Sequence, residues 1–226
     1  MSAVQHHLPG DIERTSLAII AQELAARGVT VPPEQEAVVR RVIHATADFD
    51  YAETLRFTPG AAARGAAALA AGGVIVTDTN MALAGVSKPT LAKLGGAAYC
   101  YMAGPAVAAA AKAAGTTRAV AAMHHAAAAH PGAVFAVGNA PTALFALCDA
   151  MEQGDFRPAL VIGVPVGFVN VVESKERLME VCQRLGVPAI AAMGRKGGSS
   201  VAAAICNALL YTAAGLLDPK ARGWQG

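Results

Sequence analysis

The chain has 226 residues, with 18 Lys and Arg against 16 Asp and Glu, and 54% of its residues are hydrophobic. This length suits one α/β domain with a substantial core. A net charge of +2 and an aromatic content of 5% give no case for nucleic-acid binding. No apolar run reaches membrane-spanning length without Gly, Pro or a charged residue, and much of the hydrophobicity is alanine, so we expect no membrane span.

Neither the N-terminus nor the cysteines indicate export. The opening MSAVQHHLPGDIERT has no basic segment followed by an apolar one, so we expect no secretory signal. The cysteines stand far apart without a C-x-x-C pair, which is typical of buried thiols in a reducing cytoplasm. They are Cys100, Cys148, Cys182 and Cys206. We expect a cytoplasmic protein with a single domain over 1–226, in which 1–10 and 218–226 are flexible.

The N-terminal part of the chain predicts helices. Residues 11–27 carry apolar side chains at helical spacing, and a second helix is expected from the prolines at 32–33 towards Thr46. The apolar stripe of this second helix leaves out His44. A turn at 58–60 precedes a third helix over 61–71.

From residue 73 onwards, short apolar segments alternate with helical ones. The expected strands are 73–77, 97–102, 133–137, 159–164 and 188–193. The expected helices are 79–94 (interrupted near Gly85), 105–129 (interrupted at 115–118), 143–153, 174–185 and the alanine-rich segment after residue 200. This alternation predicts a single-domain α/β fold: a mainly parallel, doubly wound sheet flanked by helices, with an N-terminal helical segment.

Ligands of such sheets bind outside the carboxyl ends of the strands. The loops 138–142, 163–174 and 194–200 all follow strand ends, so we expect them to share one edge. The loop 194–200 reads GRKGGSS, in which glycines allow close backbone approach and Ser199 or Ser200 can cap the next helix. The residues expected to contact an anion there are Arg195, Lys196, Gly197, Gly198 and Ser199.

The basic turn has neither the register of a P-loop nor a Gly-x-Gly-x-x-Gly pattern, so phosphate is not indicated. Other polar residues give weaker signals. Histidines 124, 125 and 130 have no acidic or Cys partner at a metal spacing, so no metal or cofactor is expected. Asp78 and Glu173 follow strand ends, where helix capping is a simpler role than a catalytic carboxylate pair.

His44 is a sharper candidate, because a histidine near a helix end titrates near neutrality and can give or take a proton. Arg40 and Arg41 would lower its pKa, whereas Asp48 would raise it, so the sequence leaves the sign open. Taken alone, an exposed helical histidine more often has no function.

Five motifs together resemble the precorrin-8X methylmutase family. They are RVIHATAD at 41–48, TDTNMALAG at 77–85, GNAPTALF at 138–145, GVPVGFVNVVESK at 163–175 and GRKGGSS at 194–200. The resemblance runs in order from about residue 11 to residue 210. The second and fifth motifs resemble the cobalt-precorrin-8 branch more closely. The chain departs from the family at 105–132 and after Leu217.

The resemblance implies a [1,5]-sigmatropic methyl shift from C11 to C12 of a corrin-type polycarboxylate, giving cobyrinate or its metal-free counterpart in cobalamin biosynthesis. It implies a homodimer with the active site near the subunit interface. The catalytic histidine of the family maps onto His44 as proton donor and acceptor, and substrate contacts map onto Ser16 and Arg118. We expect Asn139 to contact the substrate as well. A carrier that holds the same pigment without chemistry is the alternative, and it would have no need of His44.

Overall fold

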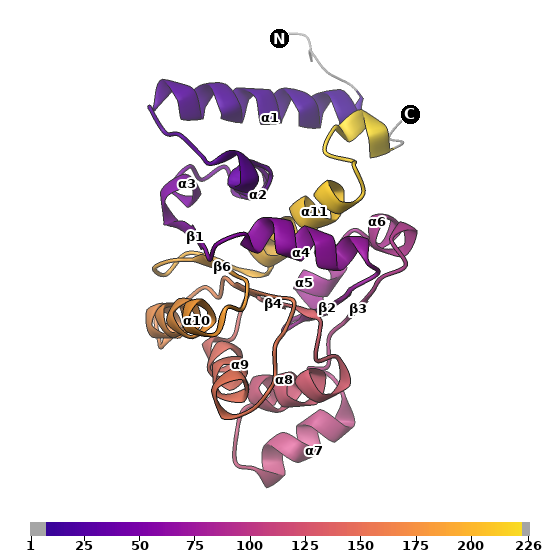
Figure 1. Cartoon of the computed structure of the whole chain (residues 1–226), viewed down its shortest axis with the longest axis vertical. Coiled ribbons are helices and arrows are strands. Elements are labelled where there is room, and N and C mark those ends of the chain that lie inside the picture. The colour runs from indigo at the N-terminus through magenta and orange to yellow at the C-terminus, as the bar shows by residue number, and fades with distance from the viewer. Residues whose placement is uncertain (1–7, 223–226) are drawn as a thin grey trace, which may run out of the picture.

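The computed structural model describes residues 8–222 and contains one six-stranded sheet in the order β1-β6-β5-β4-β2-β3 (Figure 1). β2 to β6 are parallel, and β1 pairs antiparallel with β6. The strands are β1 (Leu55–Phe57), β2 (Val74–Thr77), β3 (Ala97–Tyr99), β4 (Val134–Val137), β5 (Leu160–Gly163) and β6 (Ala189–Ala192). The expected α/β fold with a mainly parallel sheet is confirmed.

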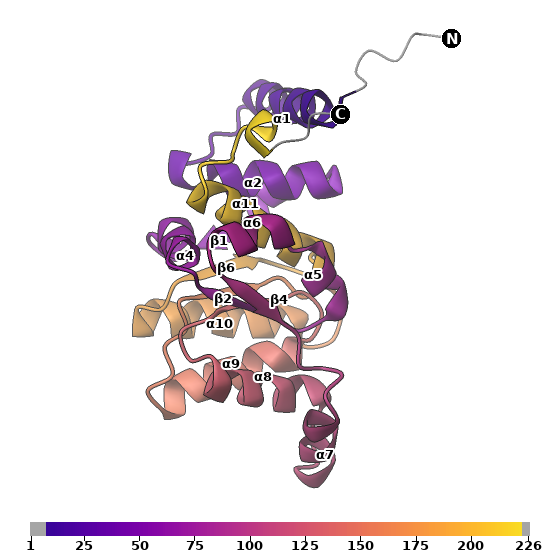
Figure 2. The ribbon, with the colours of Figure 1, turned by 90° about the vertical axis from the view of Figure 1, so that its right-hand side faces the viewer.

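Helices cover both faces of the sheet, and a further helical layer lies outside one of them (Figures 1 and 2). One face carries α4 (Ala61–Ala70), α5 (Asn80–Gly85), α6 (Lys88–Lys93) and α11 (Ser199–Ala213). The other carries α8 (Arg118–Ala129), α9 (Pro141–Gln153) and α10 (Val171–Leu185), and α7 (Pro105–Ala113) packs on the outer side of α8. Beyond α11 lie α1 (Pro9–Ala26), α2 (Pro33–Thr46), α3 (Tyr51–Thr54) and the 3-10 turn η1 (Pro219–Arg222).

The central strands β4, β5 and β6 are buried along their whole length. Successive side chains of β4 enter different cores: Val134 and Ala136 pack towards α11, whereas Phe135 and Val137 pack towards α8 and α9. This two-sided burial explains why these strands read as continuous apolar runs.

The ends of several elements differ from expectation. α3, β1 and η1 were not expected, and α10 begins at Val171 rather than at residue 174. Pro9 and Gly10 belong to α1, and 219–222, expected to be flexible, form η1. Residues 1–7 and 223–226 lie outside the described part. Within 8–222, no helix combines the length and apolar character needed to cross a membrane.

The three loops that follow β4, β5 and β6 do share one edge. The Gly198 amide donates to the Val164 carbonyl at 2.8 Å, and the Gly167 amide donates to the Arg195 carbonyl at 3.2 Å. A Cβ at Gly197 would lie 2.1 Å from the Val164 oxygen, so this backbone contact requires glycine. The loops are thus packed against one another by their main chains.

Candidate functional site

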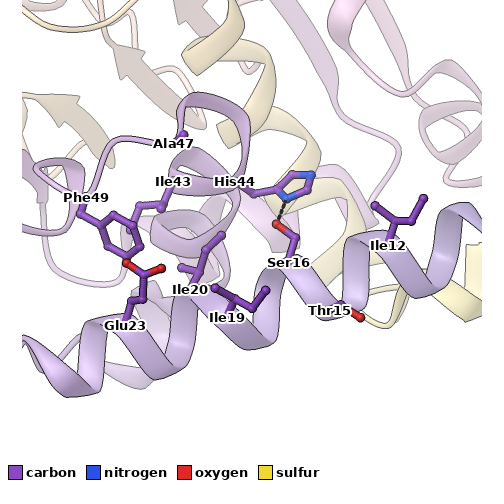
Figure 3. Close-up of a pocket in the computed structure, with 10 residues that line it drawn as sticks. All are labelled: Ile12, Thr15, Ser16, Ile19, Ile20, Glu23, Ile43, His44, Ala47 and Phe49. Atoms are coloured by element: carbon purple, nitrogen blue, oxygen red, sulfur yellow. Dashed lines mark hydrogen bonds between the residues drawn. The ribbon is translucent and has the colours of Figure 1, made fainter. Parts of the chain in front are cut away.

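A pocket of about 370 Å³ lies between α1 and α2 and brings Ser16 and His44 together (Figure 3). Ser16 Oγ lies 2.8 Å from His44 Nδ1, although the two residues are 28 positions apart in the sequence. The other lining residues are mostly apolar: Ile12, Thr15, Ile19, Ile20, Glu23, Ile43, Ala47 and Phe49. The site therefore offers a titratable imidazole, held by a hydroxyl, beside an apolar wall.

The geometry of this pair follows from how the two helices cross. α2 buries its stripe of valines and isoleucine against α11 and the core, which leaves His44 in its last turn facing α1. Ala47 then adopts a left-handed conformation with φ of 54° and ends α2 just beyond the histidine. On α1, Ile20 and Leu24 are buried and Ser16 shares their face.

A cluster of charges lies beside the Ser16–His44 pair. The Glu13 carboxylate accepts from Arg41 at 2.6 Å and from Arg222 at 2.6 and 3.1 Å. Both guanidinium groups lie over the Tyr211 ring, with Cζ at 5.1 Å for Arg41 and 4.1 Å for Arg222. With two cations around one carboxylate, the cluster carries a net positive charge.

Burial and this cluster together determine the direction of the His44 pKa shift, which the sequence left open. Partial burial lowers the pKa of His44 below its ordinary 6.5, and the charges of Arg41 and Arg222 lower it further against an opposing effect of Glu13. Asp48, which was expected to raise the pKa, is turned towards Lys196. The lowered pKa favours the neutral imidazole of His44 at pH 7 in the free protein.

The basic turn is occupied by the protein itself. Lys196 Nζ donates to Asp48 at 2.7 Å and to Asp50 at 2.6 Å, so it ties the loop after α2 to the end of β6. Arg195 lies with its Cζ 5.5 Å from the Phe168 ring and stays exposed. Of the two cations expected to meet an anion, Arg195 is thus the more available.

The sequence did not indicate that Lys175 binds this turn. Its side chain is fully buried, and its Nζ donates to the carbonyls of Gly194 and Lys196 at 2.8 Å each. Burial lowers the pKa of Lys175 to about 8. Lys175 therefore fixes two carbonyls of the turn, and the Gly198 amide is bound to the Val164 carbonyl.

The loop 138–142 is occupied in the same way. The buried Asp78 carboxylate accepts from the amides of Gly138, Asn139 and Ala140, each at 2.8 Å. Burial raises the pKa of Asp78, and these amide hydrogen bonds oppose the rise. Asp78 was expected to cap a helix, and it instead binds the loop ahead of α9. The amides of this loop are therefore not free for a ligand.

The sequence indicated that Ser199 or Ser200 can cap α11, but neither side chain does so. The N-cap of α11 is Gly198, without a side-chain cap, and Ser199 Oγ instead lies 2.7 Å from Thr79 Oγ1. Thr79 in turn caps α5 by accepting from the Ala82 amide. Ser199 therefore links the loops after β2 and β6 inside the edge.

Arg118 is not brought to His44 within one chain. It begins α8, which lies across the sheet from α1 and α2 (Figure 2). Among the described residues, its side chain takes part in no hydrogen bond or ion pair, and it is exposed. The Asn139 side chain is exposed at the carboxyl edge.

The family model described as Precorrin-8X methylmutase matches residues 11–212 of this chain. The chain belongs to the precorrin-8X methylmutase family. It is 45% identical to the cobalt-precorrin-8 methylmutase of Salmonella typhimurium, over 90% of this chain and 95% of that protein. It is 42% identical to the precorrin-8X methylmutase of Pseudomonas aeruginosa, over 88% of this chain and 93% of that protein.

A crystal structure of precorrin-8X methylmutase from Thermus thermophilus shares the fold with a TM-score of 0.80 and 43% identity, covering 90% of this chain and 98% of that one. The methylmutase resemblance read from five motifs is confirmed. The Ser16–His44 pair, the basic turn and Arg118 lie inside the matched segment, whereas η1 with Arg222 lies beyond it.

The buried Lys175 of this methylmutase gives a prediction about stability and pH. The unfolded chain keeps the lysine proton up to 10.5, whereas the folded chain releases it near 8. Because the unfolded state binds more protons between these values, the free energy of unfolding should rise with pH across that window, by about 3 kcal/mol at most. Urea unfolding of the wild type and Lys175→Met at several pH values measures this rise. The variant should lack it, and parallel curves would contradict the account.

Proposed function

We propose that this chain catalyses the migration of a methyl group from C11 to C12 of a precorrin-8-type macrocycle, with His44 as the catalytic residue. The Ser16–His44 pair in the pocket between α1 and α2 is the observation that carries this proposal. Relatives named for cobalt-precorrin-8 and for precorrin-8X are similar to this chain at 45% and 42% identity. We therefore propose the substrate class that they share, a corrin-type polycarboxylate with or without cobalt.

In the proposed reaction, His44 donates a proton to the conjugated ring near C11. The protonated ring is more electron-poor, which eases the shift: the bond from C11 to the methyl carbon breaks as the bond from C12 to that carbon forms. The ring then returns the proton to His44, so substrate and product are isomers and no electrons are lost or gained. One general acid and base serves both halves of the cycle.

A neutral imidazole cannot donate that proton, so the substrate has a part in charging it. His44 is held neutral in the free protein by burial and by Arg41 and Arg222. The acetate and propionate arms of a bound macrocycle would bring negative charge next to these arginines and raise the pKa of His44. Protonation of His44 would then accompany substrate binding.

Surfaces at the carboxyl edge suit a macrocycle with charged arms. Phe168 and Val169 are 84% and 76% exposed, and Arg195 lies over the Phe168 ring. Apolar side chains can lie against the flat ring system while a guanidinium meets a carboxylate arm. We propose Arg195 as a substrate contact, together with the exposed Asn139.

We also propose that the active unit is a homodimer. Arg118, which the family resemblance maps onto a substrate contact, lies across the sheet from His44 in the same chain. A second copy could supply its Arg118 to the pocket of the first. We propose a cytoplasmic setting because the four cysteines are free, and three of them are buried.

Replacing His44 tests the proposed chemistry. His44→Ala and His44→Asn should lower single-turnover conversion, followed by absorbance, by roughly a hundred- to ten-thousandfold, while product binding survives. Ser16→Ala is the matched control: it keeps the imidazole and should lose about tenfold or less. Wild-type turnover in His44→Ala would remove the acid–base role. Pigment binding without any turnover in the wild type would make the protein a carrier.

The pH dependence of turnover tests the proposed charging of His44. A group that must be protonated loses activity as pH rises through its pKa. The fall in kcat/KM reports the free protein and should lie below pH 6.5, because the pKa of His44 is lowered there. The fall in kcat reports the complex and should lie at higher pH. Coincident falls in the two profiles would show that the substrate does not change the charge of His44.

Separate replacements in the basic turn test which cation meets the arms. Arg195→Ala should weaken product binding by about 1 kcal/mol, since Arg195 is exposed, and should flatten the dependence of affinity on salt. Lys196→Ala should change affinity less, because Lys196 is already bound to Asp48 and Asp50. Product titrations at low and high salt compare the two variants. A larger loss of affinity in Lys196→Ala would reverse the assignment.

A further inference from the structure

The C-terminal turn η1 reaches the charge cluster beside His44. It lies against the N-terminal half of α1 in both views of the chain (Figures 1 and 2). The Arg222 side chain is only 5% exposed, and its two terminal nitrogens reach the two Glu13 carboxylate oxygens at 2.6 and 3.1 Å. The same guanidinium packs 4.1 Å from the Tyr211 ring centre. A buried guanidinium paired in this two-pronged manner makes strong, directional hydrogen bonds.

Glu13 and Ser16 are three residues apart on α1, and Arg41 and His44 are three residues apart on α2. Each pair therefore shares a helix face. The two helices are joined by two adjacent contacts, Glu13 with Arg41 at 2.6 Å and Ser16 with His44 at 2.8 Å. Arg222 holds the first contact from the side of η1, and the second contact contains the catalytic histidine.

We propose that Arg222 is a positioning residue of the methylmutase site: it holds Glu13 through both terminal nitrogens and so fixes the turn of α1 that places Ser16 on His44. This inference rests on the proposed role of His44. η1 lies outside the segment 11–212 that matches the family model, so the contact between Arg222 and Glu13 is not part of the family match. The C-terminal turn is thereby part of the active-site architecture.

The charges around His44 make the role of Arg222 measurable. His44 faces Ser16 and Glu13 on α1, with Arg41 beside it on α2, Arg222 on η1 and Tyr211 of α11 behind both arginines. The positive charge of Arg222 lowers the pKa of His44, and Glu13 raises it. Removing the Arg222 charge should therefore move the His44 titration to higher pH.

The experiment uses full-length Arg222→Gln and Arg222→Lys, with Lys220→Gln as the matched control. Lys220 lies in the same turn and pairs with Asp11 at 3.3 Å on the surface. Two quantities are measured: the titration of His44 by NMR of its imidazole without substrate, and kcat with KM. Arg222→Gln should raise the His44 midpoint and lower kcat by up to about tenfold, the loss expected when the Ser16 contact is missing, with KM little changed. Lys220→Gln should match the wild type in both.

Arg222→Lys keeps the positive charge but loses the two-pronged hydrogen bonding of the guanidinium. Its His44 midpoint should therefore stay at the wild-type value, while kcat should fall by a smaller factor than in Arg222→Gln. A wild-type midpoint and kcat in Arg222→Gln would overturn the proposal. The proposal would also be overturned if Arg222→Gln reduced the amount of folded protein but left the His44 midpoint unchanged, because that result indicates a merely structural role. Should Arg222→Gln not fold, an unchanged kcat in Arg222→Lys overturns it. The NMR titration needs no turnover, so a failed role for His44 in catalysis would leave the midpoint shift in place.

Discussion

Two buried charges of opposite sign hold the carboxyl edge of the sheet together. Asp78 accepts three main-chain amides from the loop after β4, and Lys175 donates to two main-chain carbonyls of the turn after β6. A buried charge is costly unless hydrogen bonds surround it, and here the loops themselves supply those bonds. These hydrogen bonds join the loops to one another, and the glycines at 138 and 197 allow their main chains to touch.

The fold was predictable from the alternation of apolar and helical segments, because the buried strands β4, β5 and β6 have a strong local signal. β1 has no such signal: three residues form a strand only because β6 offers them an edge to pair with. The start of α10 likewise has no local sequence signal, because it depends on the left-handed conformation of Asn170, the residue before the helix. Such boundaries depend on contacts that a local pattern does not contain.

The candidate site was predictable in part. Glycine-rich loops after parallel strands do bind charge here, but much of that charge is the protein's own, because Asp78, Lys175, Asp48 and Asp50 fill positions that the local sequence left for a ligand. His44 was a candidate by its position on the helix and by the family resemblance. The effect of Arg41 on the pKa of His44 was expected from α2, but the larger effect of burial and the opposing effects of Glu13 and Arg222 come from parts of the chain far from α2.

In the proposed reaction, the chemistry takes place in the outer helical layer, and the edge of the sheet contributes shape and charge to substrate binding. The most direct test of the proposed reaction is to follow a precorrin-8-type substrate carrying a ¹³C-labelled methyl group at C11 by ¹³C NMR, in the presence of an equal amount of unlabelled substrate. The account predicts that the wild-type protein moves the label to C12 of the same molecule, with no label in the product of the unlabelled substrate. A label that stays at C11, or that spreads between molecules, would contradict it.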